Sequence, residues 1–326
     1  MKHNKKTSVI LLTIFVIIQI VGILVINSYR PIETLSTNET IVDLPFNLNE
    51  NNSGNPISIL TSLVLAIFII SILLKYKLKY IIKFWFLIVV VISIGITINA
   101  FIKGIFTQNI TWIIAITTAL TLGILKVQIP NKYIHNATEI LIYPGVATIL
   151  LATIYTSNSS ITNIITIITI LIGISIYDIW GVRKSKIITK MAKYQMEEVK
   201  VFGGLIIPSL TKEDKLKIKL LKQKYTNKKI PQEEIKKSKI KTSAAILGGG
   251  DIAFTTLTMG IFAWTFPQQI LFNIQGLIPA IFVLIGALAG LSYIMFLGDT
   301  KKPYPAMPYI TIGILATLLV WWNVYF

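Results

Sequence analysis

Nine apolar runs of about twenty residues are the strongest constraint on how this chain can fold. A helix rising 1.5 Å per residue needs about twenty residues to cross a hydrocarbon core of about 30 Å. The chain is 54% hydrophobic and only 14% charged, which is typical of a polytopic membrane protein. We therefore predict an all-α polytopic membrane protein with nine transmembrane helices, at approximately 8–27, 56–74, 84–102, 110–126, 137–155, 161–180, 242–266, 275–297 and 304–325.

The basic residues predict the orientation of these helices. Lysine and arginine are enriched in cytoplasmic loops, and of the 31 in this chain all except Arg30 and Lys103 fall in segments on one side of the predicted spans. This places the N-terminus inside and the C-terminus outside. The first run is longer than a signal-peptide core and no small-residue cleavage site follows it, so we expect a retained helix.

The spans divide the chain into three segments. Residues 1–182 hold helices one to six, residues 183–241 form a basic cytoplasmic loop, and residues 242–326 hold helices seven to nine. Because the net charge of +17 comes from gaps between spans, we expect anionic lipids near the 183–241 loop and no nucleic-acid partner. An apolar patch at 201–208 interrupts this loop and suits a short strand or a re-entrant contact.

Several kinds of catalytic site are disfavoured by composition. The chain has no cysteine, which removes disulfides, thiolate metal sites and cysteine nucleophiles. His3 lies in the N-terminal tail and His135 in a predicted short loop, and neither has a second ligand at the spacing of a zinc site. We therefore expect no metal, no cofactor and no serine–histidine pair within the membrane.

Two aspartates lie inside the apolar runs. Asp178 precedes Arg183 by five residues and Asp251 follows Lys241 by ten, which on helices corresponds to about 7 and 15 Å from the inner charged boundary. A carboxylate inside the bilayer costs about 2.5 to 3.5 kcal/mol and marks a candidate functional site. Since both lie in the cytoplasmic half, their side chains can meet if the two helices pack together.

A facing pair of carboxyl groups can hydrolyse a peptide bond without a metal ion. Two carboxyls a few Å apart do not readily both ionise, so one keeps its proton while the other acts as a base. The base takes a proton from the attacking water, and the acid supports the developing oxyanion and then protonates the leaving amine. Such a pair titrates as a unit, so the sequence does not assign the two roles.

Glycines and prolines mark two further elements. Gly248 and Gly250 precede Asp251, and inside a helix each glycine costs about 1 kcal/mol relative to alanine. We interpret them as giving a substrate backbone access to the carboxylate, with close helix packing as the alternative. Pro-Ala-Met-Pro at 305–308 opens the last predicted span, where proline is also common for structural reasons alone.

Together these motifs resemble the presenilin and signal peptide peptidase family of intramembrane aspartyl proteases. The number of helices, the order of the motifs and the large hydrophilic loop between helices six and seven agree with that family, so the resemblance covers essentially the whole chain. One residue departs from the family pattern, because methionine stands where the family has leucine, a nearly volume-conserving change. The matching residues are Tyr177-Asp178, Gly248-Gly249-Gly250-Asp251 and Pro305-Ala306-Met307.

The resemblance implies that Asp178 and Asp251 are catalytic and that the other motif residues shape the site around them. The inferred cytosolic N-terminus looks like presenilin, whereas signal peptide peptidases run the opposite way. The chain is similar to single-subunit archaeal presenilin-like members. This implies a protein of an archaeal plasma membrane that cleaves transmembrane helices or signal peptides without a cofactor or an obligatory partner subunit.

A transmembrane substrate has to be unwound locally before water can reach its peptide bonds. Unwound backbone cannot face lipid, and pairing it as an added strand would satisfy its amide groups. The 201–208 patch and the segment before Pro305 are the candidate edges for that strand.

Three alternative functions remain open. A prepilin-type peptidase also uses Gly-x-Gly-Asp in a membrane, but it has fewer spans and lacks the Pro-Ala-Leu element. A cation channel or proton-coupled transporter would use the carboxylates to bind ions, although the spans show no obvious two-fold repeat. The third alternative is a catalytically idle scaffold.

Two further acids, Glu139 and Asp299, are expected to be interfacial groups beside lysines at the inner surface.

Overall fold

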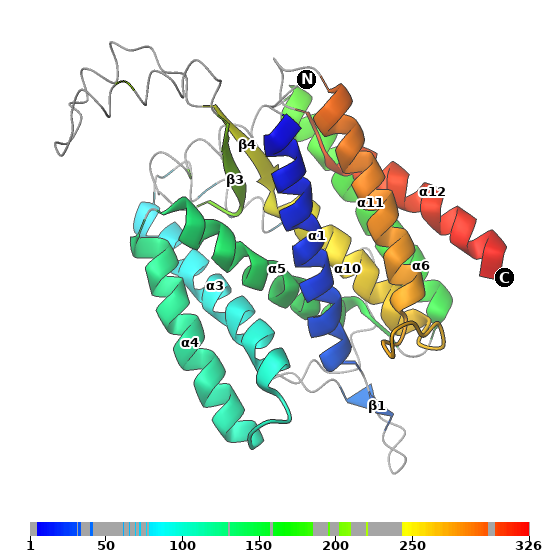
Figure 1. Cartoon of the computed structure of the whole chain (residues 1–326), viewed down its shortest axis with the longest axis horizontal. Coiled ribbons are helices and arrows are strands. Elements are labelled where there is room, and N and C mark those ends of the chain that lie inside the picture. The colour runs from blue at the N-terminus through cyan, green and yellow to red at the C-terminus, as the bar shows by residue number, and fades with distance from the viewer. Residues whose placement is uncertain are drawn as a thin grey trace.

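The computed structural model is a bundle of long helices with a small two-stranded sheet at one end (Figure 1). It describes residues 5–30, 32–33, 40–41, 78–129, 131–156, 159–184, 202–209, 243–298 and 304–325, together with residues 61, 65, 69, 72, 76, 195 and 220. Helices dominate because an apolar run that faces lipid must satisfy its backbone hydrogen bonds internally.

Seven of the described helices are long and apolar enough to cross a membrane, which is the pattern of a multi-pass membrane protein. The predicted span 56–74 falls almost entirely outside the described residues. The seven helices are α1 (Lys5–Ser28), α3 (Lys79–Ile102), α4 (Gln108–Gln128), α5 (Lys132–Ile154), α6 (Ser160–Ile179) continued by the π-helical turn η1 (Trp180–Lys184), α11 (Leu277–Leu297) and α12 (Met307–Tyr325).

The predicted span 242–266 is a strand followed by a helix. Strand β4 (Ser243–Gly248) comes first, and α10 (Gly249–Thr265) begins only after it. β4 pairs antiparallel with β3 (Gly204–Ser209), which supplies the backbone hydrogen bonds that helical turns would otherwise provide. An apolar run of six residues does not distinguish these two solutions, so the helix prediction was wrong here. Since α10 has 17 residues and is about 25 Å long, the nine-span count and the orientation stay predictions.

Two short sheets complete the secondary structure. The β3–β4 register runs from Gly204 opposite Gly248 to Ser209 opposite Ser243, so the apolar patch at 201–208 contributes a strand. Strands β1 (Ile32–Glu33) and β2 (Thr40–Ile41) form a second antiparallel pair in the polar segment after α1. The β3–β4 hairpin lies at the same end of the bundle as the start of α1 (Figure 1).

Helix α10 is the centre of the bundle. Every residue from Ile252 to Thr265 except Phe254 is buried, and the helix contacts α1, α5, α6, α11 and α12. At its C-terminal end, Nη2 of Arg30 donates to the carbonyl oxygens of Ala263 (2.9 Å) and Gln275 (2.8 Å). Burial lowers the pKa of the Arg30 guanidinium. A cation at this position stabilises the last turn of the helix.

Glycines let several helices approach backbone to backbone. Gly145 on α5 faces the Ser93 backbone of α3, where an added Cβ would overlap the Ser93 carbonyl. Gly286 of α11 and Gly313 of α12 face each other in the same way. Small residues at such crossings are typical of helices packed in a membrane.

We expect Gly145→Ala to lower thermal stability in detergent, because its Cβ has no space beside the Ser93 backbone. The cost of such overpacking is about 1 to 3 kcal/mol. Gly95→Ala on α3 is the matched control, since its nearest neighbour is the Ala119 Cβ at 3.8 Å. Equal melting temperatures for the two variants would contradict the close approach of α3 and α5.

Candidate active site

Asp178 lies in the last turn of α6 and reaches the start of α12. Its carboxylate is partly buried, and Oδ2 accepts a hydrogen bond from the backbone N–H of Met307 at 3.1 Å. The neighbouring N–H of Ala306 is also directed at this carboxylate. The structure therefore brings the Pro-Ala-Met segment against Asp178, and its part in shaping an active site stays a prediction.

The prolines explain why these two N–H groups face the aspartate. Pro305 and Pro308 have no N–H, so Ala306 and Met307 hold the only backbone donors between 305 and 308. Met307 is the first residue of α12, and its N–H has no partner within the helix. Tyr309 and Ile310 already use the Ala306 carbonyl, which starts the helix. The donors left over at this helix start are therefore available to a carboxylate.

A second contact fixes α6 and α12 at the same height. Ser175 Oγ and Thr311 Oγ1 are buried and lie 2.9 Å apart, one turn before Asp178 and one turn after Met307. Sequence reasoning missed this pair, because serine and threonine are frequent in all the spans. The contact keeps the Asp178 carboxylate level with the first turn of α12.

Asp251 lies in the first turn of α10. Its carboxylate turns back toward the N–H of Gly248, the residue that precedes the helix. This is the acidic half of a capping box, in which an acid at the third helical position satisfies the backbone donor before the helix. Oδ2 of Asp251 lies 3.1 Å from the place where a Gly248 Cβ would be. Glycine at 248 therefore leaves room for the carboxylate itself.

The two carboxyl groups lie within electrostatic range of each other. Helix α6, which holds Asp178, packs against both α10 and α12. Each carboxylate is next to the N-terminal end of a helix, where backbone N–H groups and the helix dipole favour negative charge. The structure therefore places the two acids on packed helices, each beside a helix N-terminus.

The structure defines the surroundings of the three glycines before Asp251, and access of the substrate backbone at Gly248 and Gly250 stays a prediction. They lie at the junction of β4 and α10 rather than inside a helix, so the expected interior cost does not arise. Gly250 has only Phe254 ring carbons at 3.9 and 4.0 Å from its Cβ position, which is ordinary contact. At Gly249 an added Cβ would lie 2.7 Å from the Tyr143 hydroxyl and 2.8 Å from a carbon of its ring. The middle glycine is therefore the most confined.

The ring of Tyr177 contacts the helical turn that follows Asp178. Its ring is partly buried and lies against Trp180 of η1, with 6.4 Å between ring centroids. The backbone places it next to Asp178, while its ring contacts Trp180. This position suits a role for Tyr177 in supporting η1, the turn that follows Asp178.

Gln19 is a site residue that sequence reasoning missed. It is fully buried on α1, its Nε2 donates to the Ile252 carbonyl (3.2 Å), and its Oε1 accepts from Thr256 Oγ1 (2.8 Å). These contacts fix the first turns of α10, and hence Asp251, against α1. The only signal in the sequence was a glutamine in the middle of an otherwise apolar run.

Two polar expectations need correction. Glu139 is next to a lysine, as predicted, but it is 1% exposed and forms an ion pair inside the protein rather than at the interface. His135 belongs to the first turn of α5 rather than to a loop. Asp299 and His3 lie outside the described residues. Within the described part of the chain, no group of three or more His, Asp or Glu side chains could hold a metal ion.

The chain matches a known family along almost its whole length. The family model described as signal-peptide peptidase, presenilin aspartyl protease, matches residues 12–324. A solved "presenilin family intramembrane aspartate protease" in a C222 crystal form has a TM-score of 0.52 and 14% identity, covering 95% of this chain and 94% of that one. The P2 crystal form gives a TM-score of 0.55 and 13% identity, covering 96% of each chain. No curated protein sequence matches. At such identities the structural likeness shows the fold alone.

We expect Gly249→Ala to reduce activity at least about tenfold, because the new methyl group displaces either Tyr143 or the first turn of α10. Gly250→Ala is the matched control, since its Cβ meets nothing closer than 3.9 Å. Activity is measured as cleavage of a single-span substrate in detergent. A Gly250 variant as impaired as the Gly249 variant would contradict this account of the two glycines.

Proposed function

Because this chain belongs to the signal-peptide peptidase and presenilin aspartyl protease family, we propose that it hydrolyses peptide bonds within transmembrane helices or signal peptides of membrane proteins. Family membership makes it a multi-pass intramembrane aspartyl protease. The proposal adds that Asp178 and Asp251 are the catalytic pair. The observation that carries it is the position of two partly buried carboxylates on packed helices, each at a helix start and within range of the other.

The proposed chemistry needs only the two acids and a water molecule. One carboxylate takes a proton from water as the oxygen attacks the substrate carbonyl carbon. The other, protonated, hydrogen-bonds to the developing oxyanion and then donates its proton to the nitrogen as the C–N bond breaks. The hydrogen bond from Met307 to Asp178 supports this scheme, because it holds one carboxylate in a defined orientation.

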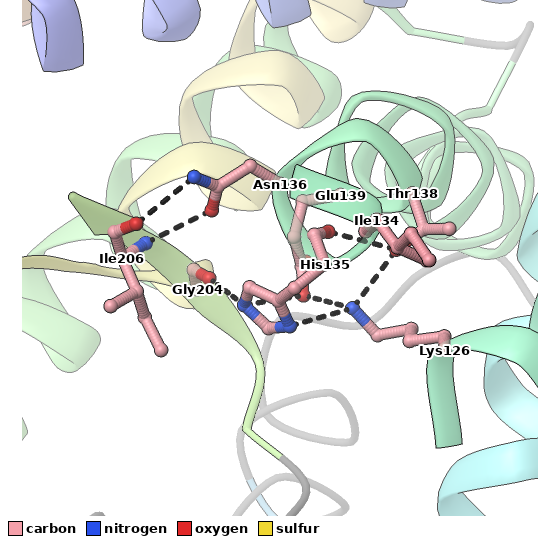
Figure 2. A network of polar contacts seen from close by, with 8 residues as sticks. All are labelled: Lys126, Ile134, His135, Asn136, Thr138, Glu139, Gly204 and Ile206. Carbon is pink, nitrogen blue, oxygen red and sulfur yellow. Dashed lines mark hydrogen bonds and ion pairs between the residues drawn. The ribbon is translucent and has the colours of Figure 1, made fainter. Parts of the chain in front are cut away.

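We also propose that the unwound substrate pairs with strand β4, because the outer edge of β3 is already occupied. Asn136 on α5 donates from Nδ2 to the Ile206 carbonyl (2.9 Å) and accepts at Oδ1 from the Ile206 N–H (3.1 Å) (Figure 2). The amide thus pairs with Ile206 as a neighbouring strand would. Of the two edges considered from sequence, the 201–208 patch is therefore blocked at Ile206, and 299–303 lies outside the described residues.

The geometry of an antiparallel pair leaves β4 as the open edge. Opposite residues either exchange both hydrogen bonds or both point away from each other. Ile206 points away toward Asn136, so its partner Ile246 points its N–H and C=O away on the other side of the hairpin. Among the described residues no backbone group pairs with Ile246 there. An added strand at this edge would run beside the start of α10 and Asp251.

The proposed setting follows from the same family assignment. We propose a plasma-membrane protein of archaeal type that works as a single subunit, without a cofactor. Its substrates are single-span or signal-peptide helices, and anionic lipids contact the basic 183–241 loop. The alternative functions, ion transport and prepilin cleavage, are distinguished by the experiment that follows.

We expect Asp178→Ala and Asp251→Ala each to abolish cleavage of a single-span substrate in liposomes, with at least about a thousandfold loss of rate. Thermal unfolding in detergent checks that each variant is folded, and Asp251→Asn serves as an isosteric variant. Retained proteolysis in either variant would refute the assignment. Ion flux lost together with the aspartates, without proteolysis, would favour the transporter, and cleavage of a prepilin leader alone would favour the prepilin-type peptidase.

We expect Ile246→Pro to lower kcat/KM about tenfold, because it removes the outward N–H that would bond to an added strand. Pairing with β3 does not use this N–H, so the hairpin should persist. Ile246→Ala keeps the N–H and is the matched control for loss of the side chain. If the proline variant turned over substrate as fast as wild type, the proposal that the substrate pairs with β4 would be wrong.

A further inference from the structure

A group of polar side chains joins α4, α5 and β3 (Figure 2). Nζ of Lys126 on α4 donates to Oε1 of Glu139 (2.6 Å) and to Oγ1 of Thr138 (3.2 Å) on α5. The Lys126 and Glu139 side chains are almost completely buried. A charge buried in this way has to be paired, so each of the two holds the other ionised.

His135 links this ion pair to β3. Its Nε2 lies 2.7 Å from the Gly204 carbonyl oxygen and its Nδ1 lies 3.2 Å from Lys126 Nζ. A carbonyl only accepts and an ammonium only donates, so these partners assign a neutral imidazole with its proton on Nε2. With His135 neutral, Lys126 is the positive charge that balances Glu139.

Tyr143 lies one helical turn after Glu139, on the same face of α5. Its side chain is 5% exposed, and its hydroxyl faces Gly249 in the first turn of α10. Glu139 is close enough to interact with this hydroxyl, although within the described residues neither the Tyr143 hydroxyl nor Oε2 of Glu139 has a partner with full hydrogen-bonding geometry. The hydroxyl also lies within electrostatic range of Asp251.

A buried hydroxyl without a partner destabilises a folded protein, and phenylalanine would fill the same volume without that cost. Because Gly249 has no Cβ, the Tyr143 hydroxyl can lie against its backbone. Hydrogen bonds of catalytic groups are often long in the resting enzyme and shorten in the complex with substrate. The Tyr143 hydroxyl is therefore available to a group of the active site.

We propose that Tyr143 is a positioning residue that holds the shared proton of the aspartate pair on Asp251. Ionised Glu139 attracts the phenolic proton, which leaves the phenolic oxygen as an acceptor facing α10. An acceptor at this place favours the Asp251 carboxylic acid, whose O–H can donate to it directly or through one water molecule. Asp178 faces two backbone donors, from Ala306 and Met307, whereas Asp251 faces only that of Gly248, so the ionised form is favoured more strongly at Asp178.

This assignment rests on the proposed function and gives each acid one role. Asp178 is the base that takes a proton from water, and Asp251 is the acid that protonates the leaving nitrogen. Tyr143 itself gives up no proton and forms no covalent bond. It orients the Asp251 O–H before the substrate arrives.

We expect Tyr143→Phe to lower kcat about tenfold with KM within about twofold of wild type, because the interaction orients a catalytic group and not the substrate. Its melting temperature in detergent should stay close to that of wild type, because phenylalanine fills the same volume. Wild-type kcat in a folded Tyr143→Phe variant would overturn the proposal.

Tyr29→Phe is the matched control. The Tyr29 hydroxyl is also buried, but it contacts the Ile96 carbonyl (3.0 Å) and Asn99 Oδ1 (2.8 Å) near the C-terminal end of α3. Removing it leaves buried acceptors unpaired, so the melting temperature should fall while kcat stays within about twofold. A kcat loss equal to that of Tyr143→Phe would mean that any buried tyrosine matters, and would overturn the specific role of Tyr143.

The orienting role of Glu139 is tested without leaving a lone buried charge. Lys126→Met combined with Glu139→Leu replaces the ion pair by apolar groups of similar size, a change that proteins often tolerate. We expect this double variant to lose kcat about as much as Tyr143→Phe, and adding Tyr143→Phe to it should cost little more. Fully additive losses would overturn the link between Glu139 and Tyr143.

Infrared difference spectroscopy locates the proton without any substrate. We expect the carbonyl band of a protonated carboxyl group to persist in Asp178→Asn and to disappear in Asp251→Asn, and Tyr143→Phe should shift its frequency. A band that disappears only in Asp178→Asn would overturn the assignment. Because these spectra need no turnover, absence of proteolysis in the wild type would refute the proposed function while the position of the proton is still measured.

Discussion

The hydrogen bond from Met307 to the Asp178 carboxylate is the contact on which the rest of the site depends. Asp178 lies at the C-terminal end of α6, where the helix dipole disfavours a negative charge. The N-terminal end of α12 offsets this effect, because its free N–H groups and its dipole favour an anion. One carboxylate therefore joins the end of one helix to the start of another, across 129 positions of the chain.

Helix α10 meets the same electrostatic requirement with groups at both of its ends. Asp251 lies at the N-terminal end and Arg30 caps the C-terminal end. Polar side chains of neighbouring helices then set its position, with Gln19 of α1 on its first turns and Asn136 of α5 on the strand that pairs with β4. Apolar packing alone fixes the height of one helix against another only weakly, so these few hydrogen bonds carry much of the alignment.

Local features of the sequence predicted well those elements that local physics controls. Seven apolar runs form long helices, because the length of a run does not depend on distant residues. Strand β4 was predicted as helix, because the β3 residues that pair with it lie 34 to 44 positions earlier in the chain, beyond the reach of a local pattern. No sequence pattern predicted the contact between Tyr143 and Gly249.

The sequence by itself determined that this chain crosses a membrane many times and that Asp178 and Asp251 need compensating partners. Both conclusions follow from the length of apolar runs and the free-energy cost of a buried charge, which hold whatever packs alongside. Only the tertiary structure decided which N–H groups face Asp178, which edge of the β3–β4 hairpin stays open, and that Tyr143 lies over Gly249. These depend on contacts between residues far apart in the chain, and a contact of that kind leaves no periodic trace in the sequence.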